Sequence, residues 1–186
     1  MNDSSSLIPH PSSIIPHPSS LIPHPLYIVH YTLYIIHYTF PMSPLLFPGS
    51  FDPFTIGHAD LVARALNLFD QVVIAVGVNE QKSGWMTVEK RVQAIKDLYK
   101  EESRVRVEQY TGLTADFARS IRATAILRGV RTIKDFEYEQ QMADVNRQLT
   151  GIDTVLLIAN PSLAAISSSL VRELAHFGHD ITPYLP

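Results

Sequence analysis

Short apolar runs alternate with longer amphipathic stretches along most of this chain, from Leu45 to the C-terminus. The runs have the length of strands, and the second of them, QVVIAVGV, is apolar throughout, as expected of a strand buried on both faces. The strands predicted from this pattern are 45–47, 71–78, 104–110, 125–129 and 154–159.

Between these runs, apolar residues recur at helical spacing. Leu61, Ala65 and Leu68 fall on one face of the first such helix, and Thr87 can cap the second. The predicted helices are 57–69, 88–99, 115–122, 135–149 and 168–177.

Strand and helix thus follow one another five times. This order predicts an α/β fold, a Rossmann-like doubly wound five-stranded parallel sheet with helices on both faces. Right-handed crossovers place every loop that follows a strand at the same edge of such a sheet. We therefore expect a ligand at the carboxyl ends of the strands, near the point where the strand order reverses.

Residues 1–41 have a different composition, with five of the eight histidines, seven of the thirteen prolines, one acid and neither Lys nor Arg. Heptads of the type SSLIPHP and then LYIVHYT repeat from Ser5 to Thr39. Two prolines in each of the first repeats exclude a coiled coil, and the stretch lacks the basic start and cleavage site of a signal peptide. We interpret 1–41 as a disordered, non-native low-complexity leader, and 42–186 as the functional domain with its natural start at Met42.

An alternative makes the leader functional, as a metal-binding tail. Its evenly spaced histidines would supply the ligands. They are His10, His17, His24, His30 and His37.

Composition excludes other classes of function. The 186 residues, 46% of them hydrophobic, suit a single α/β domain with a real core. A formal net charge of −3 argues against bulk nucleic-acid binding, and no apolar run is long enough to span a membrane. The absence of cysteine fits a reducing compartment, so we expect a cytoplasmic protein.

The loop PGSFDPFTIGH lies between the first predicted strand and the first predicted helix. Gly57 would let a ligand approach the backbone, and the helix N-terminus favours anions. His58 lies in the first helical turn, and Ser50 adds a hydroxyl. The loop matches neither a dinucleotide fingerprint nor a P-loop. A turn with a capping histidine is the structural alternative.

Two further stretches and one lysine follow predicted strands, so they lie at the same edge of the predicted sheet as this loop. ISSSLVRE (166–173) carries three serines before a helix, where one would suffice as a cap and the set could hold phosphate. In LRGVRTIKDFEYE, we expect Arg128 to end a strand and Gly129 to turn the chain, so that Arg128 and Arg131 form an anion clamp. The alternative is ion pairing with nearby acids. Lys82 follows the second strand and alone suits a solvated surface position.

These residues supply cations and hydrogen-bond donors without an evident nucleophile or metal cluster. Phosphoryl or nucleotidyl transfer needs little more, because positioning and charge stabilisation supply most of the catalysis.

The motifs themselves resemble those of a known family. GSFDPFTIGH resembles the (T/H)xGH signature of the nucleotidylyltransferase superfamily, and ISSSLVR resembles its ISSTxxR partner. RGVRTIKDFEYEQQMADVN (128–146) is more specific and is similar to bacterial phosphopantetheine adenylyltransferases. The resemblance covers 45–186.

This resemblance implies adenylyl transfer from ATP, accompanied by Mg²⁺, to 4′-phosphopantetheine, which gives dephospho-coenzyme A and pyrophosphate. It implies in-line attack without a covalent intermediate, and it assigns no metal ligand to the protein. The implied catalytic residues are His58, Lys82, Arg128 and Ser50. The implied nucleotide-binding residues are Gly49, Ser50, Phe51, His58, Gly129, Arg131, Glu139, Ser167, Ser168 and Ser169, with Asp135 orienting an arginine. The implied substrate-binding residues are Ser50, Lys82, Leu113, Thr114, Arg128, Met142 and Asn146.

The resemblance also implies a homo-hexamer, built as a dimer of trimers, with coenzyme A as a feedback ligand in the same pocket. Ser50 and Ser169 stand where threonine is common, and both keep the hydroxyl. Family members continue beyond TPYLP with a short helix, so we expect weaker C-terminal packing here.

Two rival functions remain open at the level of sequence. One is another member of the superfamily that uses nicotinamide mononucleotide or a cytidylyl donor. The other is a non-catalytic nucleotide-binding or assembly protein.

Overall fold

The computed structural model describes residues 43–78 and 84–186, and the structural statements below concern these residues. Contacts between Cα atoms divide the chain into two units, Met1–Pro41 and Met42–Pro186. The first unit lies outside the described residues, so the interpretation of the leader stays a prediction.

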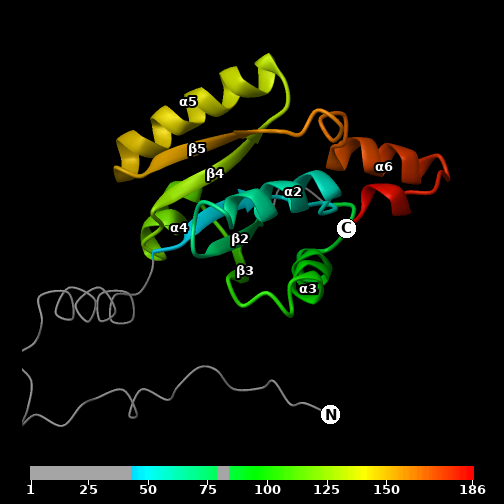
Figure 1. The fold of residues 1–186 in the computed structure, drawn as a ribbon, viewed down its shortest axis with the longest axis horizontal. Helices are drawn as coiled ribbons and strands as arrows, with labels where there is room; N and C mark the ends of the chain where they lie inside the picture. Colours follow the sequence, from blue (N-terminus) through cyan, green and yellow to red (C-terminus); the bar gives the residue numbers. More distant parts are fainter. Residues whose placement is uncertain (1–42, 79–83) are drawn as a thin grey trace, which may run out of the picture. The chain divides into compact units, whose positions relative to one another are not determined.

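Five parallel strands form one sheet in the order β3–β2–β1–β4–β5 (Figure 1). The strands are β1 (Leu45–Gly49), β2 (Val72–Gly77), β3 (Val105–Tyr110), β4 (Ala125–Val130) and β5 (Asp153–Ile158). β1 is central and pairs in parallel with both β2 and β4. The predicted five-stranded parallel sheet is confirmed, and its switch point lies between β1 and β4.

Helices cover both faces of the sheet, as predicted. They are α2 (Ile56–Ala65), α3 (Val88–Leu98), α4 (Thr114–Ser120), α5 (Ile133–Thr150) and α6 (Ser168–His176), followed by the short 3₁₀ helix η2 (Thr182–Tyr184). Figure 1 shows α5 running alongside β4 and β5. No helix among the described residues is long and apolar enough to cross a membrane.

Alternate residues of the central strands divide the core into two layers, because successive side chains of a strand point to opposite faces. Leu45 and Phe47 pack in one cluster with Val62 of α2 and Ile95 of α3. Leu46 packs in the other cluster, with residues of and around α4. The sheet is therefore buried on both sides, which explains why β2 is apolar throughout.

Most helix ends differ from the sequence-based prediction by one or more residues, and for two of them the hydrogen bonds show the cause. The first helix ends at Ala65 and not at 69, because the N–H groups of Asn67 and Leu68 bond to carbonyls three residues back and tighten the last turn. α5 begins at Ile133 and not at 135, because Thr132 is its N-cap and accepts a hydrogen bond from the backbone N–H of Asp135.

The expected turn at Gly129 is wrong. Arg128 and Gly129 both lie within β4, which continues to Val130. A Cβ atom at position 129 would overlap with Cδ1 of the buried Leu61, so glycine favours the close approach of α2 to β4 here. This close packing brings the start of α2 next to the end of β4.

Candidate active site

A cavity of about 340 Å³ lies at the carboxyl ends of β1 and β4, at the predicted edge of the sheet. Most of the residues singled out from the sequence line it. These are Gly49, Ser50, Phe51, Gly57, His58, Arg128, Gly129, Arg131, Asp135, Glu139, Ser167, Ser168 and Ser169.

Three helix N-termini border this cavity. Gly57 and His58 belong to the first turn of α2, Asp135 to the first turn of α5, and Ser168 to the first turn of α6. The N-terminal turn of a helix presents backbone N–H groups and about half a positive charge. The backbone alone therefore gives the cavity a preference for anions.

His58 caps the first turn of α2, the structural alternative offered by the sequence, and its ring also lines the cavity. It is the N3 residue of α2, and its Nδ1 atom accepts a hydrogen bond from the backbone N–H of Thr55 at 3.0 Å. The Thr55 hydroxyl lies 3.1 Å from the same nitrogen and accepts the backbone N–H of His58. A neutral imidazole that accepts at Nδ1 carries its proton on Nε2. The capping box thus fixes the tautomer and leaves Nε2–H as a donor.

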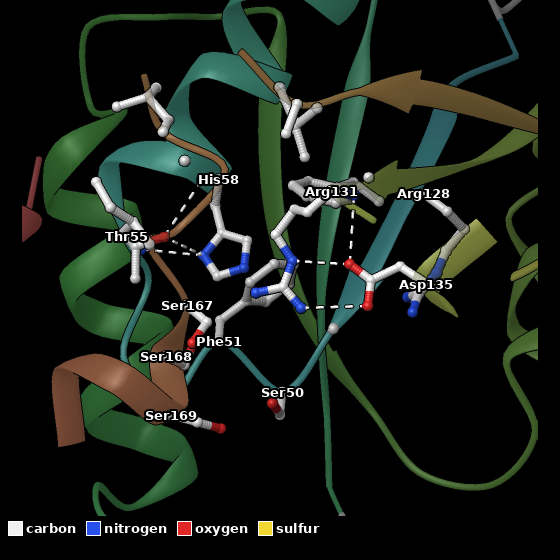
Figure 2. A pocket seen from close by; sticks show the side chains of 18 of the residues that line it. Ser50, Phe51, Thr55, His58, Arg128, Arg131, Asp135, Ser167, Ser168 and Ser169 are labelled. Atoms are coloured by element: carbon white, nitrogen blue, oxygen red, sulfur yellow. Dashed lines mark hydrogen bonds and ion pairs between the residues drawn. The ribbon is translucent and has the colours of Figure 1, made fainter. Parts of the chain in front are cut away.

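The surroundings of His58 keep it neutral. Phe51 contacts its ring edge-on with centroids 5.1 Å apart, and Phe54 lies at 5.3 Å. Burial lowers the pKa of His58 from 6.5 to about 4, with the positive charges of Arg131 and Arg128 as further causes. Figure 2 shows the imidazole beside the guanidinium of Arg131, with Ser50 and the α6 serines nearby. At neutral pH His58 is therefore a hydrogen-bond donor without charge.

Arg128 is held rigidly at the centre of the sheet edge. Its Nε and NH2 groups donate to the two carboxylate oxygens of Glu139 at 2.7 and 2.6 Å, and NH1 donates to the carbonyl of Pro48 at 2.8 Å. Burial opposes the charge, but the hydrogen bonds and attraction of Glu139 together outweigh it and raise the pKa of Arg128. The guanidinium has five N–H groups, so two remain for a ligand.

Arg131 is paired as well. Its Nε donates to the Asp135 carboxylate at 2.9 Å, four residues along the chain. The alternative interpretation, ion pairing of the arginines with nearby acids, is therefore correct as far as it goes, and the acids involved are Asp135 and Glu139. Both ion pairs line the cavity, so the arginines are oriented by carboxylates and still face it.

The three serines divide their tasks. Ser167 is the N-cap of α6, because its hydroxyl accepts the backbone N–H of Leu170. The Ser168 hydroxyl donates to the carbonyl of Pro53 at 2.8 Å, and that of Ser169 accepts from Arg172 at 3.1 Å. Capping therefore accounts for one serine. Ser168 ties α6 to the loop before α2, and Ser169 bonds to Arg172 within α6 itself.

Two further hollows adjoin the cavity and share Pro48 and Arg128 with it. The smaller one, of about 130 Å³, is lined by Thr114, Met142 and Asn146, three of the residues assigned to the second substrate. Leu113, another residue assigned to that substrate, is 60% exposed and lines none of the three hollows described. Lys82 lies outside the described residues.

Several cavity residues were missed by the sequence analysis. Leu163 comes from the turn before α6, a stretch that the sequence analysis did not single out. Ile166 and Arg172 both lie within ISSSLVRE, which was noted for its serines alone. Arg172 donates to the carbonyl of Asp52, and it is the arginine of the ISSTxxR pattern, which could have identified it. Gly49 leaves space for Phe51, since a Cβ atom there would come within 2.8 Å of the Phe51 ring.

Among the described residues, no three His, Cys, Asp or Glu side chains lie together as metal ligands. The two carboxylates of the cavity each bind an arginine. The donor set of the cavity thus fits phosphate oxygens, which can bring a hydrated Mg²⁺ with them.

Comparison with known proteins identifies the family. The cytidylyltransferase-like family model matches residues 46–174. A protein named phosphopantetheine adenylyltransferase from Phocaeicola vulgatus is 55% identical over 141 residues, which is 76% of this chain and 93% of that protein. This chain belongs to the phosphopantetheine adenylyltransferase family. Proteins of the same name from Bacteroides fragilis and Streptomyces coelicolor are 52% and 43% identical, over 76% and 75% of this chain and 94% and 87% of their own lengths.

A more distant likeness concerns the fold. The crystal structure of a bifunctional NMN adenylyltransferase/ADP ribose pyrophosphatase from Francisella tularensis matches with a TM-score of 0.58 and 17% identity. The match covers 78% of this chain and 44% of that one. At this identity the likeness concerns the fold alone.

Proposed function

We propose that this protein transfers the adenylyl group of ATP to 4′-phosphopantetheine, giving dephospho-coenzyme A and pyrophosphate. One observation on this chain itself supports the proposal, apart from its family membership. Three helix N-termini, Arg128, Arg131 and a neutral His58 all lie at one cavity. Such a cavity binds a polyphosphate and can stabilise the charge that builds up when the α-phosphorus is attacked.

In the proposed reaction, a phosphate oxygen of 4′-phosphopantetheine attacks the α-phosphorus of ATP in line. The new oxygen–phosphorus bond forms as the bond to the pyrophosphate oxygen breaks, without a covalent enzyme intermediate. Nε2–H of His58 donates to an α-phosphate oxygen as negative charge grows there. Because burial keeps His58 neutral at pH 7, it acts as a hydrogen-bond donor and not as a charged imidazolium.

The remaining residues hold the two substrates. Ser50, Lys82 and Arg128 orient the attacking phosphate, and the two free N–H groups of Arg128 suit that task. The other residues divide between two groups. The nucleotide is assigned to Gly49, Phe51, Gly129, Arg131, Glu139, Ser167, Ser168 and Ser169. The pantetheine arm is assigned to Thr114, Met142 and Asn146, which line the adjoining hollow, together with the exposed Leu113.

Mg²⁺ is part of the ATP substrate in this proposal. Bound to the ATP phosphates, the ion would supply positive charge to the pyrophosphate leaving group. The arginines and helix N-termini of the chain bind the remaining phosphate charge.

The experiment that tests the proposal is an acceptor and donor panel. Pyrophosphate release is followed with ATP or CTP as donor, and with 4′-phosphopantetheine, nicotinamide mononucleotide or no acceptor. We expect release only from ATP with 4′-phosphopantetheine. Release with nicotinamide mononucleotide or from CTP would assign another nucleotidyl transfer, and ATP binding without any release would indicate a non-catalytic protein.

Coenzyme A is proposed as a feedback ligand, since it carries both the pantetheine arm and the adenylate that the site holds. Inhibition that is competitive with 4′-phosphopantetheine supports this, and no inhibition at millimolar coenzyme A removes it. The same proposal places the enzyme in the cytoplasm and its activity in residues 42–186. Deleting residues 1–41 should then leave pyrophosphate release unchanged.

We also propose that the protein assembles as a homo-hexamer. Along α5, apolar side chains remain exposed at helical spacing: Tyr138 is 58% exposed, Met142 37%, Val145 46% and Leu149 49%. An apolar face of this size on one helix is typical of a subunit interface. Analytical ultracentrifugation should give a hexamer that Val145→Asp dissociates and the surface control Lys96→Glu does not. A wild-type monomer at micromolar concentration would contradict this part.

A further inference from the structure

A closed ring of hydrogen bonds lies behind the cavity and joins two segments that are distant in the sequence. The carboxylate of Asp52 accepts the backbone N–H groups of Trp85 and Met86 at 2.7 and 2.8 Å. Arg91 of α3 donates from Nε to the carbonyl of Met86 at 3.1 Å and from NH1 to the carbonyl of Ser50 at 2.6 Å. Met86 is thus held by its N–H on one side and by its C=O on the other.

Both charged members of this ring are buried, Asp52 to 6% and Arg91 to 7% exposure. A buried charge is costly unless hydrogen bonds satisfy it. Here the groups that satisfy the two charges are backbone atoms, not surface side chains. The ring therefore fixes the path of the chain at Ser50 rather than merely stabilising the surface.

The residue that follows Ser50 shows why this path needs support. Phe51 has a φ of +47°, a left-handed conformation that is unfavourable for a bulky side chain. Such strain persists only where the surroundings hold it. The carbonyl before Phe51 is held by Arg91, and the carbonyl after it, that of Asp52, is held by Arg172. In this conformation the Phe51 ring contacts His58.

We propose that Arg91 and Asp52 are positioning residues for the reaction, which set the Ser50 hydroxyl and the Phe51 ring against the substrate phosphates without touching them. This inference rests on the proposed adenylyl transfer. Neither residue lines the cavity at the carboxyl ends of β1 and β4. The planar guanidinium is needed because it reaches two carbonyls from one side chain, which an ammonium group cannot do with the same geometry.

The test compares Arg91→Lys with Ile95→Val. Ile95 lies one turn further along α3, is 1% exposed and has no part in the ring. Both variants are assayed for pyrophosphate release well below their melting temperatures, so that the protein is folded. We expect kcat of Arg91→Lys to fall roughly 10- to 100-fold, and that of Ile95→Val to stay within about twofold of wild type.

A double-mutant cycle separates positioning from general stability. If Arg91 acts through Ser50, the loss of kcat caused by Arg91→Lys becomes smaller by about threefold or more in a Ser50→Ala background. Hydrogen exchange gives a readout that needs no turnover: amides of residues 50–54 should exchange faster in Arg91→Lys, and amides near residue 95 should not.

Two results would overturn the inference: an Arg91→Lys kcat within twofold of wild type, or an equal loss with and without the Ser50 hydroxyl. If wild-type protein released no pyrophosphate with 4′-phosphopantetheine, the proposed function would fail first. In that case the affinity for ATP, measured by calorimetry, would be compared between wild type, Arg91→Lys and Ile95→Val in place of kcat. An Arg91→Lys affinity equal to wild type, with unchanged exchange at 50–54, would refute the positioning role independently.

Discussion

The Nδ1 atom of His58 accepts the backbone N–H of Thr55 at 3.0 Å, so one hydrogen bond both caps α2 and fixes the tautomer of the histidine. The proton of the neutral ring is thereby placed on Nε2, the atom available to a ligand. The structural role and the chemical role of His58 are carried by opposite nitrogens of one ring, and substitutions can separate them.

His58→Asn and His58→Gln divide these two roles. The Asn oxygen can replace Nδ1 as the cap acceptor but leaves no donor at the position of Nε2, whereas the Gln amide can donate there but loses the cap. We expect His58→Asn to raise the barrier by about 2.7–4 kcal/mol, with little change in ATP affinity. His58→Gln should keep more of kcat and lose about 1 kcal/mol of stability. Steady-state kinetics and thermal unfolding check both, and a near-normal kcat for His58→Asn would refute the donor role.

The buried imidazole also makes stability depend on pH. The pKa of His58 is about 4 in the folded protein and 6.5 in the unfolded chain. Between these values the unfolded chain binds a proton that the folded protein does not, so the free energy of unfolding falls as the pH falls from 6.5 to 4. The loss amounts to roughly 3 kcal/mol and is absent above pH 7.

Urea unfolding of wild type and His58→Asn at several pH values isolates this contribution, because the other titrating groups are shared. As the pH is lowered, the free energy of unfolding should fall more steeply in wild type than in His58→Asn. A difference that stays constant from pH 7 to pH 4 would show that His58 titrates normally.

The Arg128–Glu139 pair should matter far more than a surface pair. Glu139 is 7% exposed and binds two N–H groups of Arg128. Glu139→Gln should lower the free energy of unfolding by about 1.5–3 kcal/mol and raise KM for 4′-phosphopantetheine, because Arg128 loses its orientation. Asp153→Asn is the control, since its pair with Arg147 is 3.5 Å long and both side chains are 70% exposed. That variant should change stability by less than about 0.5 kcal/mol. If chemical denaturation gave the same loss of stability for Glu139→Gln and Asp153→Asn, the structural importance of the Arg128–Glu139 pair would be contradicted.

Two glycines at the cavity should respond differently to alanine. Gly129→Ala forces a methyl group against Leu61, which is 6% exposed, and should cost about 1–3 kcal/mol of stability. At Gly57 the nearest atom to a Cβ is 3.6 Å away, so the variant should fold normally. Its methyl group would border the cavity and weaken ATP binding. Thermal unfolding and calorimetry distinguish the two cases, and similar melting temperatures for both variants would contradict this account.

The sequence predicted the order of strands and helices because buried parallel strands and amphipathic helices have different apolar periods. It also placed the loops of His58 and Ser168 on one edge, since that follows from parallel topology. Gly129 was misread because a glycine after an arginine resembles a turn, while its real cause is Leu61, 68 positions earlier in the chain. Arg91 was missed because its partners are backbone carbonyls, which leave no pattern in the sequence.

The most direct test of the central claim is a single-turnover measurement with enzyme in excess over ATP, quenched with and without 4′-phosphopantetheine. Pyrophosphate and dephospho-coenzyme A are then quantified together. Direct transfer predicts no pyrophosphate without the acceptor and equal amounts of both products with it. Pyrophosphate released without the acceptor, with the adenylyl group retained on the quenched protein and not freed as AMP, would show a covalent adenylyl-enzyme. No release in either case would contradict the proposed function.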